Sequence, residues 1–299
     1  MIPHLNQPDL LELCLRGVTA VRSGEGWALE EVLVCDNGSA SAQGPDAVCA
    51  RFEGVRVIDA ADKQGPGPAR NAGAAAASGD IIAFTDSDTQ PTAAWLPAIA
   101  AAFSADPTRQ VIGGDIRICA ANPGALTPIE AYESVYSFRA RDYVERDNYA
   151  ATANMAVRRS VFDRVGPFGG IEIAEDSDWG RRAVASGVAL HFVPEALVFH
   201  PARADFPALV RKWDRLTSHA WSRVDGAAGL AVWIAKAIAL ALSGPIEVVK
   251  IARSDRVSGI SARRDAFLVL WRVRLYRAQL MLRLAFGAST RAASAAWRE

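Results

Sequence analysis

Cysteine is scarce in this chain and forms neither a metal-ligand pattern nor a disulfide framework. The four cysteines among the 299 residues, Cys14, Cys35, Cys49 and Cys119, have no spacing typical of metal ligands. They lie in stretches that have the patterns of helices, strands and loops. We therefore expect reduced thiols, which fits a cytoplasmic protein.

The first residues also lack the marks of a secretory signal. Met1 is followed at once by sequence typical of a folded domain, without a basic stretch and a longer apolar stretch, so we expect no signal peptide. Apolar residues make up 51% of the chain and charged residues 22%, which excludes a disordered protein. The length favours one or two globular domains.

The chain has no net charge, because 33 basic residues balance 33 acidic ones, but the charges are unevenly distributed. Residues 1–202 carry a net charge of −10 and residues 203–299 a net charge of +10. An acidic first part suits a metal-dependent site, and a basic second part suits an anionic surface. Nucleic acid is the competing partner, but long aliphatic runs separate the basic residues. We therefore expect a membrane surface and no nucleic acid.

The most informative stretch joins a glycine-rich turn, an alanine-rich helix and a short strand. Residues 65–73 read GPGPARNAG, and the apolar run 81–84 has the length and branching of a buried strand. Asp86 and Asp88 follow two positions apart, so their side chains point the same way in extended backbone. At the carboxyl end of a strand, where α/β sheets bind ligands, two such carboxylates suit Mn²⁺ or Mg²⁺ with phosphate oxygens. An ordinary Asx-rich turn is the alternative.

Three other stretches each have a structural and a functional interpretation. Asp36 ends an apolar strand and either accepts hydrogen bonds from a base or ribose, or closes an Asx turn. Glu175 and Asp176 begin a helix, where acids also complement the helix dipole. Residues 188–200 are typical of two short strands around a turn at Pro194, and His200 at their end is either a turn residue or a ligand.

The order of these motifs resembles family 2 glycosyltransferases with the GT-A fold. The likeness rests on the glycine-rich turn with Ala-Arg-Asn-x-Gly, the Asp-x-Asp (DXD) pair at 86–88 and the Glu-Asp-x-Asp run at 175–178. It implies an α/β fold with a mainly parallel sheet flanked by helices. It also implies a metal-dependent, inverting transfer of sugar from a nucleoside diphosphate sugar, with UDP as the expected nucleotide. The acceptor would be a hydroxyl of a saccharide or a lipid-linked molecule, in polysaccharide or glycolipid biosynthesis.

The resemblance assigns catalytic and metal-binding roles to the matching residues. Asp88 and Asp86 would hold Mn²⁺ or Mg²⁺, with Asp86 near the ribose or the metal, and His200 would contact the metal or the diphosphate. Asp176 would be the general base that takes the proton of the acceptor hydroxyl, and Glu175 would orient it.

The resemblance also places a nucleotide-binding edge at the start of the chain. Contacts to the nucleotide would come from Pro3, Asn6, Asp36 and Arg70. The sequence departs from the family here, because a single residue precedes Ile2 and the family's first strand is longer. A dinucleotide-binding fingerprint is excluded, since the third glycine of that motif would fall at Arg70.

The chain is expected to have a GT-A catalytic domain over residues 1–205 and a helical, basic tail over residues 206–299. Residues 227–246 are apolar with Lys236 in the middle, so the free energy of inserting them into a bilayer is near zero and spanning stays open. Residues 266–286 carry four arginines, which favours an interfacial helix. We expect docking at the cytoplasmic face of a membrane; packing within the protein is the alternative.

Two other function classes stay open on the sequence. A metal-dependent nucleotidyltransferase would also use acidic residues on an α/β sheet, but would release diphosphate from a nucleoside triphosphate. A catalytically degenerate, membrane-docked binding protein would not turn over a sugar donor, although the intact acidic motifs count against it.

Overall fold

The computed structural model describes residues 1–122, 124–170 and 173–287. The chain forms two compact units, the first of residues 1–117 and 139–201, the second of residues 118–138 and 202–299. The second unit therefore takes residues 118–138 in addition to the tail.

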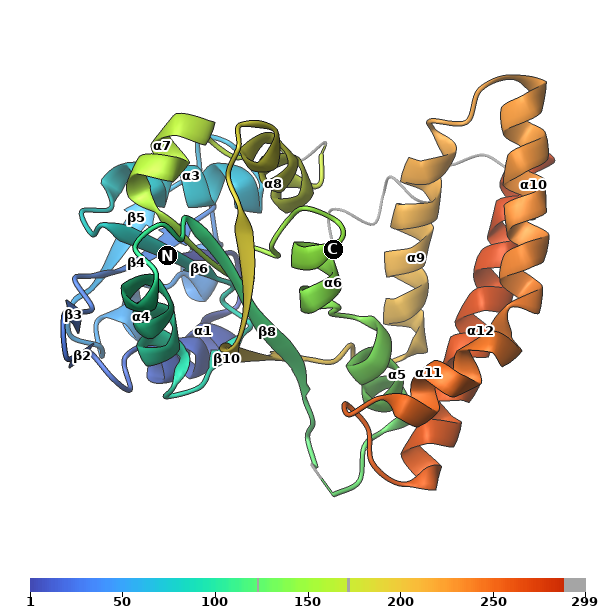
Figure 1. Cartoon of the computed structure of the whole chain (residues 1–299), viewed down its shortest axis with the longest axis horizontal. Helices are drawn as coiled ribbons and strands as arrows, with labels where there is room; N and C mark the ends of the chain where they lie inside the picture. Colours follow the sequence, from blue (N-terminus) through green and yellow to red (C-terminus); the bar gives the residue numbers. More distant parts are fainter. Residues whose placement is uncertain (123, 171–172, 288–299) are drawn as a thin grey trace. The chain divides into compact units, whose positions relative to one another are not determined.

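Strands and helices alternate through the first unit (Figure 1). Up to the first crossing into the second unit they are β1 (Ile2–His4), α1 (Pro8–Val18), β2 (Ser23–Gly24), β3 (Trp27–Ala28), β4 (Val32–Asp36), α2 (Asp46–Cys49), β5 (Val55–Asp59), α3 (Pro66–Ala76), β6 (Ile81–Thr85), β7 (Gln90–Pro91), α4 (Trp95–Ala105) and β8 (Val111–Cys119). Where the chain re-enters the first unit, at residues 139–201, the elements are α6 (Ala140–Glu145), β9 (Asn154–Arg158), α7 (Arg159–Val165), α8 (Glu175–Ala185) and β10 (Leu190–Pro201).

Two main sheets carry these strands. The first has the order β1-β4-β5 and is parallel throughout, as the sequence predicts. The second has the order β6-β9-β8-β10-β7, and its pairs β6–β9, β8–β9 and β7–β10 are antiparallel. The prediction of a mainly parallel sheet is therefore wrong for the second sheet. An apolar run indicates a buried strand, but its direction depends on connections that local sequence does not record.

Residues 190–201 form one strand rather than the two short strands predicted around Pro194. β7 pairs with β10 only at Val198 and Phe199, so Pro194 has no partner residue on β7. Proline lacks an N–H and is tolerated in a strand where that group is not needed. The turn predicted at Pro194 is therefore wrong, while the apolar pattern around it is that of a real strand.

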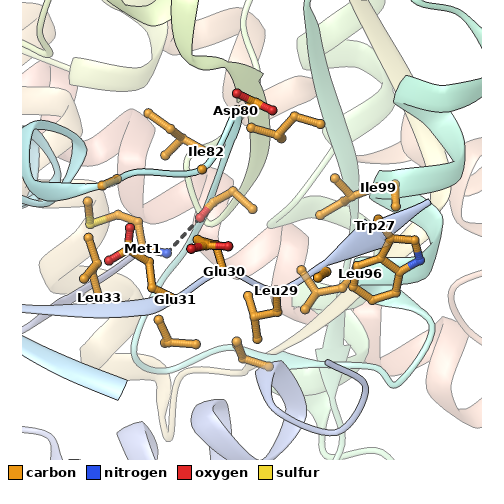
Figure 2. A pocket seen from close by; sticks show the side chains of 18 of the residues that line it. Met1, Trp27, Leu29, Glu30, Glu31, Leu33, Asp80, Ile82, Leu96 and Ile99 are labelled. Atoms are coloured by element: carbon orange, nitrogen blue, oxygen red, sulfur yellow. Dashed lines mark hydrogen bonds between the residues drawn. The ribbon is translucent and has the colours of Figure 1, made fainter. Parts of the chain in front are cut away.

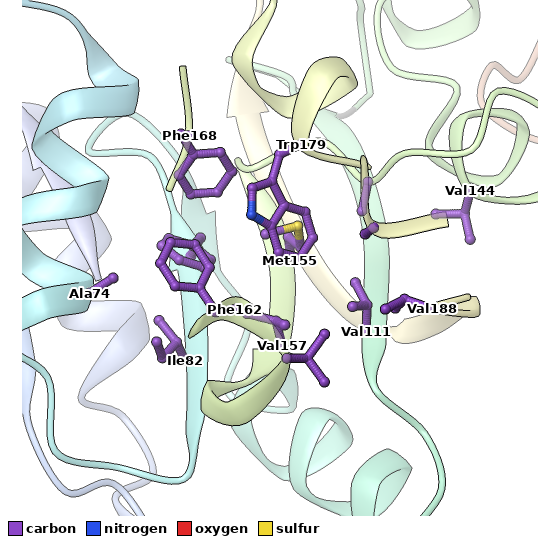
Figure 3. Packing of buried hydrophobic residues seen from close by; sticks show 14 residues of the cluster. Ala74, Ile82, Val111, Val144, Met155, Val157, Phe162, Phe168, Trp179 and Val188 are labelled. Carbon is purple, nitrogen blue, oxygen red and sulfur yellow. The ribbon is translucent and has the colours of Figure 1, made fainter. Parts of the chain in front are cut away.

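The main core of the first unit ties the end of β6 to the start of α8. Phe84 on β6 is fully buried and meets Phe168 edge-on, with ring centroids 5.4 Å apart. Phe162 stacks against Trp179 of α8 at 5.8 Å, and the Trp179 indole N–H donates to the carbonyl of Gly166 at 2.8 Å (Figure 3). Because Phe84 lies two residues before Asp86 and Trp179 three after Asp176, this packing fixes the backbone of both acidic motifs.

A cavity of about 510 Å³ lies at the opposite, amino-terminal end of β6 (Figure 2). Its lining includes Leu33 of β4, Ile82 of β6 and Ile99 of α4. The buried amino group of Met1 donates to the carbonyl of Ala83 at 2.9 Å beside it, and burial lowers the pKa of that amino group. Asp86 and Asp88 follow the other end of the strand, so this cavity is not where the acidic motifs meet.

The second unit is helical. Its helices are α5 (Pro128–Tyr136), α9 (Phe206–Trp221), α10 (Gly226–Leu242), α11 (Glu247–Arg253) and α12 (Ile260–Ala285). α5 joins the unit because Ala131 and Tyr132 are buried in one apolar cluster with Leu209 of α9 and Leu270 of α12. No single described helix is long and apolar enough to cross a membrane; residues 226–242 and 244–253, bent by 55°, meet the length and composition requirements together.

Replacing Phe84 with alanine tests the role of the aromatic core. Phe84→Ala should lower the free energy of unfolding by about 3–5 kcal/mol, since a fully buried ring is removed. Leu13→Ala on α1, where the side chain is 45% exposed, is the matched control and should cost about 0.5 kcal/mol. Urea denaturation measures both values, and equal losses would show that this cluster does not support the fold as described.

Candidate active site

A tightly bonded turn positions the Asp-x-Asp pair at the end of β6. The hydroxyl of Thr89 donates to the carbonyl of Asp86 at 2.8 Å, and the Thr89 amide donates to the same oxygen at 3.1 Å. The hydroxyls of Thr85 and Thr89, both fully buried, lie 2.6 Å apart. The two threonine hydroxyls thus find their hydrogen-bond partners within the protein. The side chains of Asp86 and Asp88 stay partly exposed, at 29% and 25%.

Arg70 joins the two acidic motifs. It lies on α3, its side chain is 3% exposed, and its two terminal nitrogens donate to different carboxylates. One reaches Asp86 at 2.5 Å and the other Glu175 at 2.9 Å, although Glu175 lies 105 positions away in the chain. Burial alone would lower the pKa of Arg70, but the charges of Asp86 and Glu175 more than offset it and raise that pKa. The guanidinium therefore stays charged and holds the motifs together.

Asp176 lies beside this ion network at the start of α8. Burial, followed by the negative charge of Glu175, raises the pKa of Asp176 to about 6. The charge of Asp86 adds to the rise, while Arg70 and a hydrogen bond from the amide of Ser177 at 2.7 Å oppose it. A carboxylate with this pKa is mostly ionised at neutral pH and is a stronger base than an exposed aspartate, as proton abstraction requires.

The first turns of α3 also hold the chain that leads into α8. The side-chain amide of Asn71 donates to the carbonyl of Phe168 at 2.9 Å and accepts from the Phe168 amide at 2.8 Å. Gly67 approaches the same segment so closely that a Cβ there would lie 2.4 Å from the carbonyl oxygen of Gly169. Only glycine fits at that contact, which explains one glycine of the glycine-rich turn.

Asp88 and His200 form an arrangement suited to a divalent cation. His200 Nε2 lies 3.4 Å from a carboxylate oxygen of Asp88, and His200 Nδ1 lies 2.7 Å from the carbonyl of Pro201. In the neutral imidazole Nδ1 must therefore carry the proton, which leaves the Nε2 lone pair facing the carboxylate. Two acceptors facing each other call for a proton or a cation, and adjacent ligands of an octahedral ion are about 3 Å apart.

Other ligands of such a cation would come from outside this pair. Across residues 1–122, 124–170 and 173–287, no group of three His, Cys, Asp or Glu side chains is arranged to hold a metal ion. Asp86, the other expected ligand, has one carboxylate oxygen bound to Arg70. Mg²⁺ and Mn²⁺ commonly complete their shells with phosphate oxygens and water, so the Asp88–His200 pair still fits the expected ion.

Three of the expected nucleotide-binding residues, Pro3, Asn6 and Asp36, lie together at the ends of β1 and β4, whereas Arg70 lies on α3 and binds Asp86 and Glu175. His4 is opposite Asp36 in the parallel pairing, and Pro3 is opposite Cys35. Asn6 has a left-handed backbone, with φ of 55°, and its side chain accepts from the Ala40 amide at 2.9 Å just beyond Asp36. Pro3, Asn6 and Asp36 thus share one edge of the first sheet, as predicted.

His4 was not identified from the sequence. It is 2% exposed, accepts at Nε2 from the Gln7 amide at 3.3 Å and donates from Nδ1 to Asp36 at 3.2 Å. The Asp36 carboxylate also accepts from the Ser39 hydroxyl at 2.5 Å, so both neighbours fix its orientation. A histidine at the end of a short apolar strand was the available signal, but only the β1–β4 register reveals its partner.

A family model and two curated relatives all match this chain to glycosyltransferases. The Glycosyl transferase family 2 model matches residues 1–166. The chain is 31% identical over 221 residues to Glycosyltransferase AglE of Haloferax volcanii, covering 72% of this chain and 70% of the relative. It is also 31% identical over 192 residues to the Pre-mycofactocin glycosyltransferase of Mycobacterium tuberculosis, covering 61% of this chain but only 39% of that protein.

A solved structure supports the fold. The structure of the mannosyltransferase PcManGT of Pyrobaculum calidifontis in complex with GDP-Man and Mn²⁺ matches over 99% of this chain and 77% of its own, with a TM-score of 0.54. At 18% sequence identity this likeness establishes the fold, and the predicted GT-A arrangement is confirmed.

Removing the Arg70 charge tests the electrostatics of the site. In Arg70→Met the pKa of Asp176 should rise above about 6, because a cation that lowers it is lost. The exposed Arg164 on α7 offers a control, Arg164→Met, that should leave this pKa unchanged. Carbon NMR of the labelled aspartate carboxyl carbons against pH follows the titration. An Asp176 that titrates identically in both variants would contradict the coupling to Arg70.

Proposed function

The chain belongs to glycosyltransferase family 2, and we propose that it moves a sugar from a nucleoside diphosphate sugar to a hydroxyl by a single inverting displacement. The observation that carries this proposal is the convergence at Arg70. One guanidinium binds Asp86 of the Asp-x-Asp motif and Glu175 beside Asp176, so the two acidic motifs lie next to each other. UDP is the nucleotide expected from the family resemblance.

In the proposed reaction Asp176 is the general base. Its carboxylate takes the proton of the acceptor hydroxyl while that oxygen forms a bond to the anomeric carbon from the face opposite the leaving group. The bond between the anomeric carbon and the diphosphate oxygen breaks, and its electron pair leaves with the nucleoside diphosphate. Asp176 then gives the proton to solvent. Arg70 fixes Glu175 next to it, so the carboxylates keep their positions during the displacement.

Asp88 and His200 are the residues that would hold Mn²⁺ or Mg²⁺. When bound, the cation neutralises the charge that develops on the leaving diphosphate. His200 is oriented for this by its Nδ1 hydrogen bond to the Pro201 carbonyl, which turns Nε2 toward Asp88. Asp86, held by Arg70, has its second oxygen to offer to the ribose or the metal. Asp36, Asn6 and Pro3 would contact the nucleotide at the neighbouring edge.

The variant Asp176→Asn tests the base assignment, because it should lower kcat without lowering the stability of the fold. Loss of the general base should lower kcat by roughly 10²–10⁴-fold while donor affinity stays unchanged. The variant should also be more stable than the natural protein at pH 7. The pKa of Asp176 is raised on folding, so its contribution to stability is present below about pH 4 and lost as the pH rises through about 6.

The measurement is nucleoside diphosphate release from a panel of nucleotide sugars with Mn²⁺, together with urea denaturation at pH 7. A fully active Asp176→Asn enzyme would overturn the base assignment. Release of diphosphate from a nucleoside triphosphate would instead support nucleotidyl transfer. Absence of turnover with every donor would support the binding-protein alternative.

We further propose that the second unit docks on the cytoplasmic face of a membrane, so that the acceptor is a saccharide or lipid-linked molecule at that surface. The support is a series of apolar side chains exposed along α10, α11 and the turn between them. Leu242 is 72% exposed, Ile246 76% and Val249 54%, and Lys250 and Arg253 follow on α11. Exposed apolar residues next to basic ones suit an anionic lipid surface.

Sedimentation with anionic liposomes tests this docking. The natural protein should bind the liposomes, and the double variant Ile246→Ser/Val249→Ser should bind at least about 10-fold more weakly, since two exposed apolar side chains lose their contact with lipid. Leu13→Ser on α1 of the first unit, also an exposed apolar side chain, is the control and should bind normally. Equal binding by all three proteins would contradict docking through this surface.

A further inference from the structure

Tyr149 lies against the helix that carries the proposed base. A Cβ on Gly180 of α8 would lie 2.4 Å from the Cβ of Tyr149 and 2.5 Å from its Cα, so Tyr149 occupies the space that a side chain at position 180 would fill. Asp176 and Gly180 are four residues apart and lie on the same face of α8, where the Cβ atoms of such a pair are about 5–6 Å apart. The side chain of Tyr149 therefore begins about one helical turn from Asp176.

A left-handed residue brings Tyr149 onto this face of the helix. Asn148 has a φ of 61°, and its carbonyl oxygen would lie 2.8 Å from a Cβ on Gly180. Asparagine adopts this conformation more readily than most residues, but still at a cost in free energy. The amide of Tyr149 donates to the carbonyl of Tyr143 at 3.0 Å, which ties the turn to α6. The turn at 148–149 is thus held between α6 and α8.

A second tyrosine fixes the ring of Tyr149. The rings of Tyr143 and Tyr149 stack with their centroids 4.9 Å apart and an angle of 20° between their planes. The guanidinium carbon of Arg139 lies 5.7 Å from the centroid of the Tyr143 ring. Stacked aromatic pairs are stabilised beyond the burial of their surfaces. The Tyr149 hydroxyl is therefore held at a defined place, because its ring does not turn freely.

The Tyr149 hydroxyl is a hydrogen-bond donor in the neighbourhood of Asp176. Burial, followed by the charges of Tyr143 and Asp176, raises the pKa of Tyr149, so the hydroxyl keeps its proton at neutral pH. The effect of the Asp176 charge agrees with the closeness of the two residues across Gly180. Within residues 1–122, 124–170 and 173–287 this hydroxyl has no hydrogen-bond partner. Because Tyr149 is half-buried and not enclosed, a bound molecule can reach the hydroxyl and supply the missing acceptor.

We propose that Tyr149 donates a hydrogen bond to the sugar acceptor, at an oxygen next to the hydroxyl that Asp176 deprotonates. The attacking oxygen uses a lone pair for its new bond to the anomeric carbon, and a donor bound to that oxygen would weaken it as a nucleophile, so Tyr149 serves a neighbouring oxygen. The acceptor is then a molecule with adjacent hydroxyls, such as a free or lipid-linked saccharide, and not a simple alcohol. This inference rests on the proposed sugar transfer and names the acceptor class for the same site.

Tyr149→Phe tests this contact, because it removes the hydroxyl and keeps the stacked ring. The acceptor probes are the methyl glycosides of glucose, mannose and galactose, with methanol as the probe that has a single hydroxyl, and the products of transfer and of donor hydrolysis are both measured. The natural enzyme should transfer sugar to at least one glycoside more readily than to methanol. Tyr149→Phe should raise the KM for that glycoside about 3–10-fold, as the loss of one neutral hydrogen bond predicts, and shift the products from transfer towards hydrolysis.

Tyr276→Phe is the matched control, because it removes the same group from a tyrosine of the second unit, where the hydroxyl donates to Asp214. It should keep both the KM for the glycoside and the ratio of transfer to hydrolysis. The proposal is overturned if Tyr149→Phe keeps them as well, if Tyr149→Phe loses transfer and hydrolysis in parallel, as a purely structural role predicts, or if the natural enzyme prefers no glycoside to methanol. A natural protein that hydrolyses no donor would overturn the proposed function, and this inference with it.

Discussion

The site depends on one buried guanidinium. Arg70 bridges Asp86 and Glu175, two carboxylates contributed by distant parts of the chain. Without it, Asp86, Glu175 and Asp176 would repel one another in a partly buried place. The same cation moderates the pKa of Asp176, which burial and Glu175 would otherwise raise further. One residue therefore both joins the motifs and limits the rise in the pKa of the proposed base, which burial causes above all.

The fold supplies the frame that makes this bridge possible. The aromatic core fixes the end of β6 and the start of α8, and Asn71 and Gly67 of α3 hold the segment that precedes α8. α3 therefore carries both Arg70 and the contacts that position its partners. The glycine-rich turn and alanine-rich helix serve close packing as much as ligand binding, which explains why small residues dominate there.

Local signals predicted the strand before Asp86 and the helix at Asp176, because these depend on short apolar runs and helix-start residues. The family resemblance, and not a local signal, indicated the edge that carries Pro3, Asn6 and Asp36. Long-range features escaped prediction. The antiparallel direction of the second sheet, Pro194 inside β10 and the partners of His4 and Arg70 all depend on residues far away in the sequence. The family resemblance located Arg70 at the site, but only the structure reveals that carboxylates occupy both its terminal nitrogens.

The central claim is that Asp176 activates an oxygen nucleophile for a single displacement at the anomeric carbon. The most direct test is proton NMR during donor hydrolysis, with water as the acceptor, recorded before the released sugar mutarotates. The account predicts that the first sugar formed has the anomeric configuration opposite to that of the donor. Release of sugar with the donor's own configuration would contradict it.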